Sequence, residues 1–204
     1  MNQTASMEES ILEAAEKLFL KKGFAATSTT EIAREAGCNQ ALVHYYFRKK
    51  DRLFEAIFQK KASYFVSNLL QISQSNLPFE EKLAKKIETH FEFIQRNPKL
   101  PLFFFGELST NPDRLAAMRE KFSELPKSAV EGFRRELEEA VSNGTVRPTN
   151  VLDLLMTIVS LNVTVFIAEP IFKIISNMDD QSYQQFLEQR KKENVKIILN
   201  SLRP

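Results

Sequence analysis

The chain has 204 residues, 43% of them hydrophobic, and a formal net charge of only +2. This length suits one large domain, or a small domain joined to a medium one, with a buried core. A charge this close to zero excludes a global polycation, so any attraction to nucleic acid must come from local placement of basic residues.

The sequence has one cysteine, Cys38, which excludes an internal disulfide and a zinc site built from several cysteines. A single thiol fits a reducing compartment, and the first twenty residues lack the apolar core of a signal peptide. The longest uncharged apolar stretch, residues 154–168, is shorter than the roughly 20 residues that span a bilayer. We therefore expect a cytoplasmic protein without membrane contact, and a buried helix at residues 154–168.

Five glycines and the lack of any run of strictly alternating polarity favour an all-α chain. The first helix is expected between Ser6 and Gly23, and the second between Ser28 and Gly37. Each of these serines stands three residues before a glutamate, which is the spacing of a capping box. A glycine at the end of each segment is typical of a helix C-terminus.

A third short helix is expected from Asn39 to about residue 47, directly after the Gly37-Cys38 corner. Two short helices joined by a tight glycine corner form a helix-turn-helix, whose second helix enters the DNA major groove. A long fourth helix should begin at Lys50 and end at a break between Ser75 and Pro78.

Further helices are expected at about 79–96, 112–142, 150–173 and 180–202, with a short apolar segment at 101–108. Pro126 should kink or split the stretch 112–142, because proline removes a helical hydrogen bond. We place a DNA-binding domain at residues 1–50 and a larger helical domain at 51–204. No flexible linker separates them, so the fourth helix would couple their motions.

Residues 8–54 resemble the N-terminal DNA-binding domain of the TetR family of transcriptional regulators. The resemblance rests on a helix ending in KKGFAATS, then TTEIAREAG, a short helix closing in HYYF, and KKDRL. Three positions depart from the family: Cys38 stands for the common valine, His44 for the usual tyrosine, and Tyr46 for a frequent histidine. The resemblance implies an all-α fold, with a three-helix DNA-binding domain followed by a ligand-binding and dimerisation bundle.

Several residues of this segment suit contact with DNA phosphates. Thr29 offers a hydroxyl group and the amides of a helix N-terminus, and His44 and Tyr45 can donate hydrogen bonds to phosphate oxygens. Lys50 supplies a cation where the family has a lysine. Taken alone, such a basic cluster is more often a solvated helix start, and tyrosines are more often packing residues.

Base readout needs side chains at the start of the third helix. Gln40 is the candidate for adenine, because its amide can form two hydrogen bonds with that base. Ala41 is small enough to approach a thymine methyl group, whereas Asn39 either reads a base or caps the helix. Val43 should lie in the core. Cys38 either senses redox state or replaces a small apolar residue.

The remaining helices are expected to hold an effector site, as the resemblance implies. Small-molecule sites are mostly apolar with a few placed polar groups, and this part of the chain is rich in phenylalanine. The effector should therefore be a small apolar or aromatic molecule, either without polar groups or with a hydrogen-bonding or cationic group. The alternative is that these phenylalanines are core residues and the histidine is a hydrogen-bonded core residue. The candidates are Phe65, His90, Phe91, Phe104, Glu107, Asn162 and Phe166.

The helices expected at 150–173 and 180–202 are the eighth and ninth along the chain, and are candidates for a homodimer interface. Two such helices from each protomer would form a four-helix bundle. The recognition helices would then enter successive major grooves about 34–36 Å apart, so the target would be an inverted repeat. The last helix would contribute its apolar residues Phe186, Leu187, Val195, Ile198 and Leu202.

We expect a ligand-responsive repressor that binds double-stranded DNA and is released by its effector. The alternatives are a TetR-like activator and a helical adaptor for protein partners. An enzyme is disfavoured, because the two histidines are far apart and the sequence has no phosphate loop, metal-ligand cluster, or nucleophile beside a base. No catalytic residue, metal or cofactor is expected.

Overall fold

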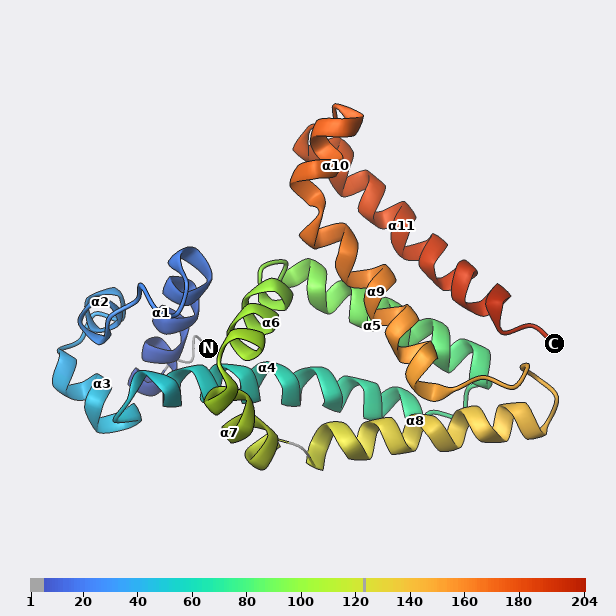
Figure 1. Cartoon of the computed structure of the whole chain (residues 1–204), viewed down its shortest axis with the longest axis horizontal. Helices are drawn as coiled ribbons and strands as arrows, with labels where there is room; N and C mark the ends of the chain where they lie inside the picture. The colour runs from blue at the N-terminus through green and yellow to red at the C-terminus, as the bar shows by residue number, and fades with distance from the viewer. Residues whose placement is uncertain (1–5, 123) are drawn as a thin grey trace, which may run out of the picture. The chain divides into compact units, whose positions relative to one another are not determined.

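A computed structural model describes residues 6–122 and 124–204 of the chain (Figure 1). The described residues form helices and no strand, as predicted for an all-α chain. The helices are α1 (Met7–Lys22), α2 (Thr29–Glu35), α3 (Gln40–Phe47), α4 (Lys50–Ser73), α5 (Phe79–Arg96), α6 (Leu100–Thr110), α7 (Pro112–Phe122), α8 (Glu124–Ser142), α9 (Val151–Ile167), α10 (Glu169–Ser176) and α11 (Asp180–Ser201).

Local side-chain hydrogen bonds begin the first two helices. The Ser6 hydroxyl accepts a hydrogen bond from the Glu9 amide at 3.2 Å, and the Glu9 carboxylate accepts one from the Ser6 amide at 3.3 Å. Ser28 and Glu31 form the same reciprocal pair at the start of α2. Both predicted capping boxes are confirmed. Gly23 ends α1 with a φ of 86°, which lies in the region that favours glycine.

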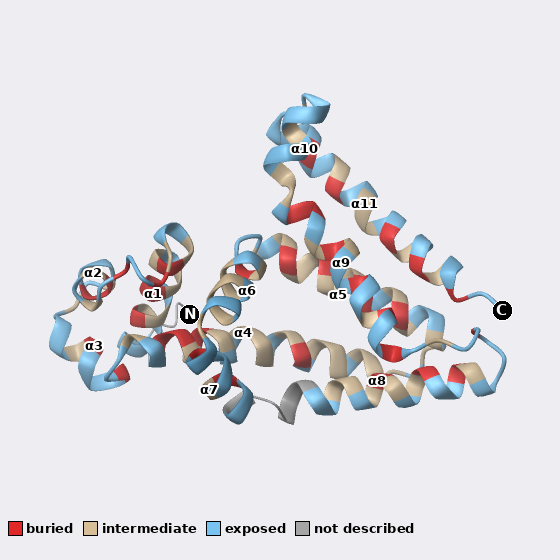
Figure 2. Ribbon diagram, in the orientation of Figure 1, coloured by how far each residue is buried: buried red, intermediate tan, exposed pale blue. Residues whose placement is uncertain are grey.

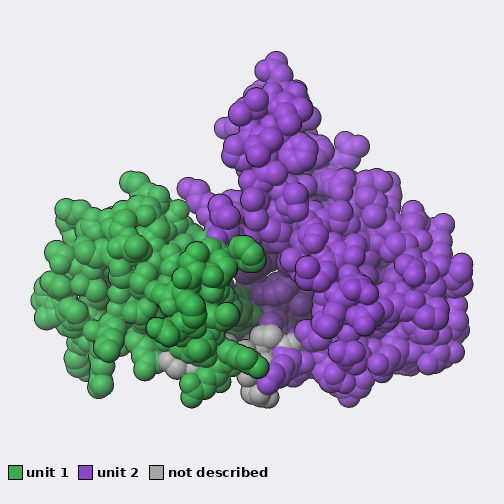
Figure 3. All heavy atoms as spheres, viewed as in Figure 1, with its two compact units in different colours: residues 1–63, 103–122 green, residues 64–102, 123–204 purple. Residues whose placement is uncertain are grey.

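The described chain divides into two compact units (Figure 3). The first holds the described residues up to 63 together with 103–122, and the second holds those of 64–102 and 123–204. Both α4 and α6 have residues in each unit. This division differs from the predicted boundary at residue 50, because α6 and α7 pack with the N-terminal helices. The domain boundary at residue 50 stays a prediction.

The first unit has a core rich in aromatic side chains. Phe19 and Phe54 are 1% and 0% exposed, and Phe24 lies between them with ring centroids 5.1 and 5.9 Å away. Phe103 and Phe104 of α6 pack against this core. Cys38 also packs against it as a partly buried residue, as expected for a small apolar substitute.

In the second unit α5 packs against α9 and α11 and forms two apolar clusters with them and with α8. Leu187, Ile198 and Leu202 lie inside these clusters and are at most 2% exposed. Their predicted place at a dimer interface is wrong, because they face the chain's own core. Phe186 and Val195 are partly buried against the same clusters.

The helix predicted at 150–173 is two helices. Proline at position 170 lies in the first turn of α10, where its missing amide costs no hydrogen bond, and α9 and α10 meet at 64°. The prediction of a buried helix is only half correct. Leu154, Ile158 and Phe166 are buried, whereas Met156 and other apolar residues of α9 are exposed. The ribbon of α9 accordingly carries both buried and exposed positions (Figure 2).

No single helix among the described residues is long and apolar enough to cross a membrane, and only the bent pair α9 and α10 meets those criteria together. The stretch predicted at 112–142 is also split, into α7 and α8. Pro126 lies in the first turn of α8, the part of a helix that tolerates proline.

Candidate functional site

The third helix presents a polar face and hides an apolar one. Val43 and Phe47 are 1% and 7% exposed and anchor α3 in the core of the first unit, as predicted for Val43. Gln40, Ala41 and His44 lie on the exposed side. Burial of one face therefore leaves the side chains expected to contact DNA free to meet a partner.

Asn39 begins α3 as its cap. The side-chain oxygen of Asn39 accepts a hydrogen bond from the Leu42 amide at 2.9 Å, which satisfies a donor that the helix itself leaves unpaired. Of the two roles left open for this residue, the structure displays the cap. Asn39 is exposed, and its amide nitrogen forms no hydrogen bond with the described residues.

Gln40 is held by its neighbours on the same surface. Its amide nitrogen donates to the Thr29 hydroxyl at 2.9 Å and lies 3.3 Å from His44 Nε2. Its amide oxygen accepts a hydrogen bond from the Thr30 hydroxyl at 3.2 Å. These hydrogen bonds link α2 to α3 and orient Gln40, the residue predicted to contact a base. To bind Gln40, a DNA base must replace one of these hydrogen-bond partners.

His44 is oriented by the end of α3. Its Nδ1 lies 3.1 Å from the carbonyl oxygen of Arg48, which can only accept, so Nδ1 carries the proton in the neutral ring. His44 Nε2 then accepts from Gln40. Arg48 itself has a φ of 52°, an uncommon conformation for a residue with a side chain, and it ends the helix.

Tyr45 is 77% exposed, and its ring stands edge-on to that of Tyr46 with the centroids 5.2 Å apart. Tyr45 is therefore not a residue of the protein core, the alternative role for this tyrosine. Exposed large aromatic side chains beside polar ones are typical of a binding surface. Tyr46 is 40% exposed.

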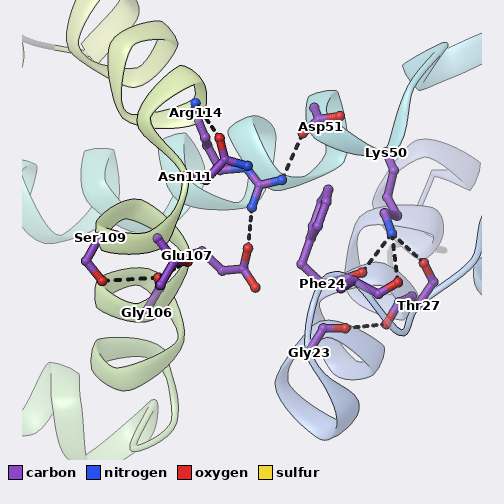
Figure 4. A network of polar contacts seen from close by, with 12 residues as sticks. Gly23, Phe24, Thr27, Lys50, Asp51, Gly106, Glu107, Ser109, Asn111 and Arg114 are labelled. Carbon is purple, nitrogen blue, oxygen red and sulfur yellow. Dashed lines mark hydrogen bonds and ion pairs between the residues drawn. The ribbon is translucent and has the colours of Figure 1, made fainter.

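Lys50 is engaged within the protein. Its ammonium group donates to the carbonyl oxygens of Phe24 at 2.7 Å and Thr27 at 2.8 Å, and lies 3.4 Å from that of Ala25 (Figure 4). It also stands 4.3 Å from the centre of the Phe24 ring. Burial is the main cause that lowers the pKa of Lys50 below its ordinary value. Through these contacts Lys50 stabilises the loop between α1 and α2.

Arg48 and Lys49 are exposed basic residues of this segment that form no ion pair among the described residues. Arg52 pairs with Glu55 at 2.9 Å. Arg48 and Lys49, which directly precede α4, therefore supply unpaired positive charge beside α3 in the described part of the chain.

A buried arginine that the sequence did not single out joins α7 to α4. The Arg114 guanidinium lies 3.8 Å from the centre of the Phe24 ring and donates to Asp51 at 2.9 Å and to Glu107 (Figure 4). Only its spacing of seven residues from Glu107 hinted at a pair, since the link to Asp51 spans 63 positions. Glu107 is therefore an ion-pair partner in the first unit.

The second unit holds an apolar cavity of about 130 Å³. It is bounded by α4, α5, α8 and α9, and its lining is apolar except for Ser73, Lys86 and His90. The Lys86 ammonium forms an ion pair with the Glu136 carboxylate and lies 4.8 Å from the centre of the Phe133 ring. Burial lowers the pKa of Lys86, and Glu136 opposes this change. A ligand in this cavity would thus meet mainly uncharged surface.

A second cavity of the same unit, about 430 Å³, lies between α4 and α5. It is the larger one, but polar and charged side chains such as Asn68, Lys85 and Arg96 make up much of its wall. Small-molecule sites are mostly apolar with few polar groups, so the smaller cavity fits an effector better. Phe65 lines both cavities.

The model of the family described as "Bacterial regulatory proteins, tetR family" matches residues 11–57, which span α1 to the first turns of α4. The chain belongs to the TetR family. The resemblance predicted from residues 8–54 is confirmed, and a TetR-family member of this kind is a DNA-binding transcriptional regulator.

This TetR-family protein is similar to its relatives in sequence and in structure over most of its length. The fatty acid metabolism regulator protein of Bacillus subtilis (strain 168) is 23% identical over 147 residues, which cover 72% of this chain and 74% of the relative. A tetR-family regulatory protein from Rhodococcus RHA1 has a similar structure, with a TM-score of 0.76 and 18% identity over 98% of each chain. The regulator FadR from Bacillus subtilis, solved with stearoyl-CoA, has a TM-score of 0.71 at 19% identity and covers 95% of this chain and 98% of its own.

The residues predicted to form the effector pocket of this TetR-family protein do not share one cavity. Phe65 and His90 line the apolar cavity, and Asn162 supports His90 from the core. Phe91 and Phe166 pack on each other in the core, with ring centroids 5.1 Å apart. They are 0% and 6% exposed, so they fill space and do not line it.

The other two predicted pocket residues of the TetR-family chain lie in the first unit. Phe104 packs on Phe54 and Phe58, and Glu107 pairs with Arg114. Both side chains of α6 therefore have partners within the first unit, and their place in an effector pocket stays a prediction. The sequence also missed the cavity residues Ala129 and Val130 of α8, for which only helical periodicity offered a signal.

Proposed function

We propose that this TetR-family regulator is a repressor that binds an inverted-repeat DNA site as a homodimer and leaves it when an effector occupies the apolar cavity. The observation that supports DNA binding is the exposed face of α3, where Gln40, His44 and Tyr45 lie beside two basic residues that form no ion pair within the described residues. Hydrogen-bonding side chains on such a helix read bases and phosphates, while cations supply affinity.

Contacts to phosphates would come from both ends of the motif. Thr29 begins α2, where free backbone amides attract anions, and Tyr45 projects its hydroxyl from the exposed side of α3. Arg48 and Lys49 would supply the cations, and Lys50 would hold the corner that positions them. Base readout would fall to Gln40, with Ala41 close enough to touch a thymine methyl group.

The homodimer would form mainly through α9. Its outward apolar side chains recur at helical spacing and stay exposed in the single chain. The stripe comprises Leu152 (57% exposed), Met156 (65%), Val159 (42%) and Ile167 (43%), and continues into α10 with Ile171 (60%) and Ile174 (81%). The exposed face of α11 is polar apart from Ile197, so this helix would contribute less than predicted.

A second copy of the chain fits this stripe best. The stripe is long, carries only Asp153 as a charge within α9, and lies opposite the face that the chain itself buries. Self-complementary apolar faces of this kind form two-fold dimers. The two recognition helices of such a dimer would meet successive major grooves, about 34–36 Å apart.

The effector is proposed to be a molecule with an apolar acyl chain that enters the cavity. The relative from Bacillus subtilis is named a fatty acid metabolism regulator, and its structural counterpart was solved with stearoyl-CoA. The cavity of this chain has an apolar wall that suits a hydrocarbon tail. The effector must bind the DNA-free form more tightly than the DNA-bound form, since equal binding would shift nothing.

Fluorescence anisotropy tests this function directly. The full-length protein is titrated against labelled DNA from upstream of its own gene, at several salt concentrations and with random duplex as competitor. We expect competitor-resistant binding that weakens steeply with salt, and release on addition of a long-chain acyl-CoA. Absence of binding even at low salt would refute a DNA-binding regulator, and binding that ignores acyl-CoA would refute the effector class.

A further inference from the structure

Three polar side chains form a chain of hydrogen bonds in the second unit, from the apolar cavity into the core. His90 of α5 lines the cavity, Asn162 of α9 contacts it from the core, and Asn194 of α11 contacts Asn162. Both asparagines are 0% exposed. Buried polar groups carry a cost unless they are fully paired, so this arrangement calls for a specific role.

The Asn162 amide has a determined orientation. Its nitrogen donates to the carbonyl oxygen of Ile87 at 2.9 Å, and its oxygen accepts from the Asn194 amide at 2.9 Å. The opposite orientation would set the Asn162 oxygen against the carbonyl oxygen of Ile87 and the Asn162 nitrogen against the amide nitrogen of Asn194. The amide nitrogen of Asn194 also donates to the carbonyl oxygen of Leu161 at 3.2 Å, which holds the second amide in turn.

This orientation determines the tautomer of His90. The Asn162 nitrogen lies 3.2 Å from His90 Nδ1, and an amide nitrogen can only donate, so Nδ1 must accept. Burial lowers the pKa of His90 to about 4, so the ring is neutral near neutral pH. A neutral imidazole with an accepting Nδ1 carries its proton on Nε2.

Among residues 6–122 and 124–204, the His90 ring forms a hydrogen bond only at Nδ1, so its Nε2–H group has no protein partner there. The ring lies beside Phe65, with centroids 5.4 Å apart, and both residues line the cavity. Of the other polar lining residues, Lys86 is committed to Glu136. The cavity therefore offers an oriented donor in a mostly apolar wall.

We infer that His90 is a specificity residue that donates from Nε2 to a hydrogen-bond acceptor on the effector, such as the carbonyl oxygen of a ketone, ester or thioester, with Asn162 and Asn194 as positioning residues. This inference rests on the proposed function insofar as the cavity is the effector site. A cationic amine at the same position would meet a donor and lose its hydration without a partner, so the cavity should reject it.

The tautomer can be measured without any ligand. The sequence has two histidines, so nitrogen-15 labelling of histidine and a long-range proton–nitrogen correlation spectrum at mildly alkaline pH resolves both rings. We expect His90 to be protonated on Nε2 and His44 on Nδ1, with His44→Gln used to assign the signals. Protonation of His90 on Nδ1 would overturn the inference, whatever the variants below show.

The ligand preference is tested with two probes of one carbon skeleton, 2-heptanone and 2-aminoheptane, added to the full-length protein. Methyl NMR titrations give the dissociation constants. We expect the ketone to bind the wild type at least about tenfold more tightly than it binds His90→Phe, which keeps a ring but lacks the donor. The control Ser142→Ala removes a hydroxyl group from an exposed position of α8 that does not line the cavity, and should bind the ketone as the wild type does.

Equal ketone affinity in the wild type and His90→Phe, no ketone binding to the wild type, or tighter binding of the amine would each overturn the inference. If His90→Phe does not fold, Asn162→Leu replaces it in the titration, since loss of the positioning amide should also weaken ketone binding. These readouts contain no DNA. A chain that prefers the ketone but never binds DNA would refute the proposed repressor and leave the role of His90 standing.

Discussion

The Arg114 guanidinium stacks on Phe24, with its central carbon 3.8 Å from the ring centre. The ammonium of Lys50 lies 4.3 Å from the centre of the same ring. Phe24 is therefore in contact with two cations, one from α7 and one from the start of α4. Through this ring, the corner that follows α1 is tied to helices that lie far along the chain.

Replacement of Arg114 by alanine should destabilise the protein by roughly 3 kcal/mol, because it leaves the Glu107 carboxylate without its partner and uncovers Phe24. Urea denaturation followed by circular dichroism would measure the loss. Arg119→Ala, at an exposed site of the same helix, is the matched control and should change little. Equal denaturation midpoints for the two variants would contradict a structural role for Arg114.

Gln40→Ala should cost about 1–3 kcal/mol of affinity for the specific DNA site while sparing random duplex. The reason is that the amide of Gln40 is the group placed to read a base, while phosphate contacts lie elsewhere. Anisotropy with both DNAs measures the two affinities on one protein sample. A loss of the same size on random duplex would remove Gln40 from base readout.

Lys49→Ala should change DNA binding, whereas Lys50→Ala should change the stability of the protein. Lys49 is exposed, so its loss should reduce the slope of the logarithm of DNA affinity against the logarithm of salt concentration by about one unit. The melting temperature should not change. Lys50 donates hydrogen bonds to three carbonyl oxygens, so its loss should lower the melting temperature. The slope of DNA affinity against salt concentration should stay almost unchanged. A flattened slope in Lys50→Ala with normal melting would restore the phosphate contact first predicted for this lysine.

Met156→Glu should convert the dimer to monomers, because it puts a charge in the exposed apolar stripe of α9. Sedimentation velocity measures the assembly state, and anisotropy should show a matching loss of affinity for the inverted repeat. Gln185→Glu adds the same charge to an exposed position of α11 and serves as the control. A Met156→Glu protein that remains dimeric would exclude α9 as the main interface.

His90 should make the free energy of unfolding depend on pH. Its pKa is lowered from 6.5 to about 4 in the folded protein, so between these values the unfolded chain binds more protons. Stability from this group is complete above about pH 6.5 and is lost as the pH falls toward 4, by up to roughly 3 kcal/mol. His90→Phe should lose less stability over this range, as measured by urea denaturation at each pH, and an unchanged dependence would contradict a buried neutral histidine.

The sequence by itself determined the elements whose signals are local. The capping boxes at Ser6 and Ser28, the glycine at position 23 and the helix-turn-helix order all follow from residues a few positions apart, because helix ends depend on nearby hydrogen bonds. The family resemblance rests on the same short segment, and the face of α3 that carries Gln40 followed from helical periodicity.

Tertiary structure alone decided which distant residues meet. Glu107 was expected beside His90 but pairs with Arg114, and Lys50 was expected on phosphate but binds the carbonyl oxygens of the corner after α1. In the same way His90 gained its tautomer from Asn162, a residue 72 positions away. Packing brings such partners together through the burial of whole helix faces, and no spacing within one segment of sequence records that outcome.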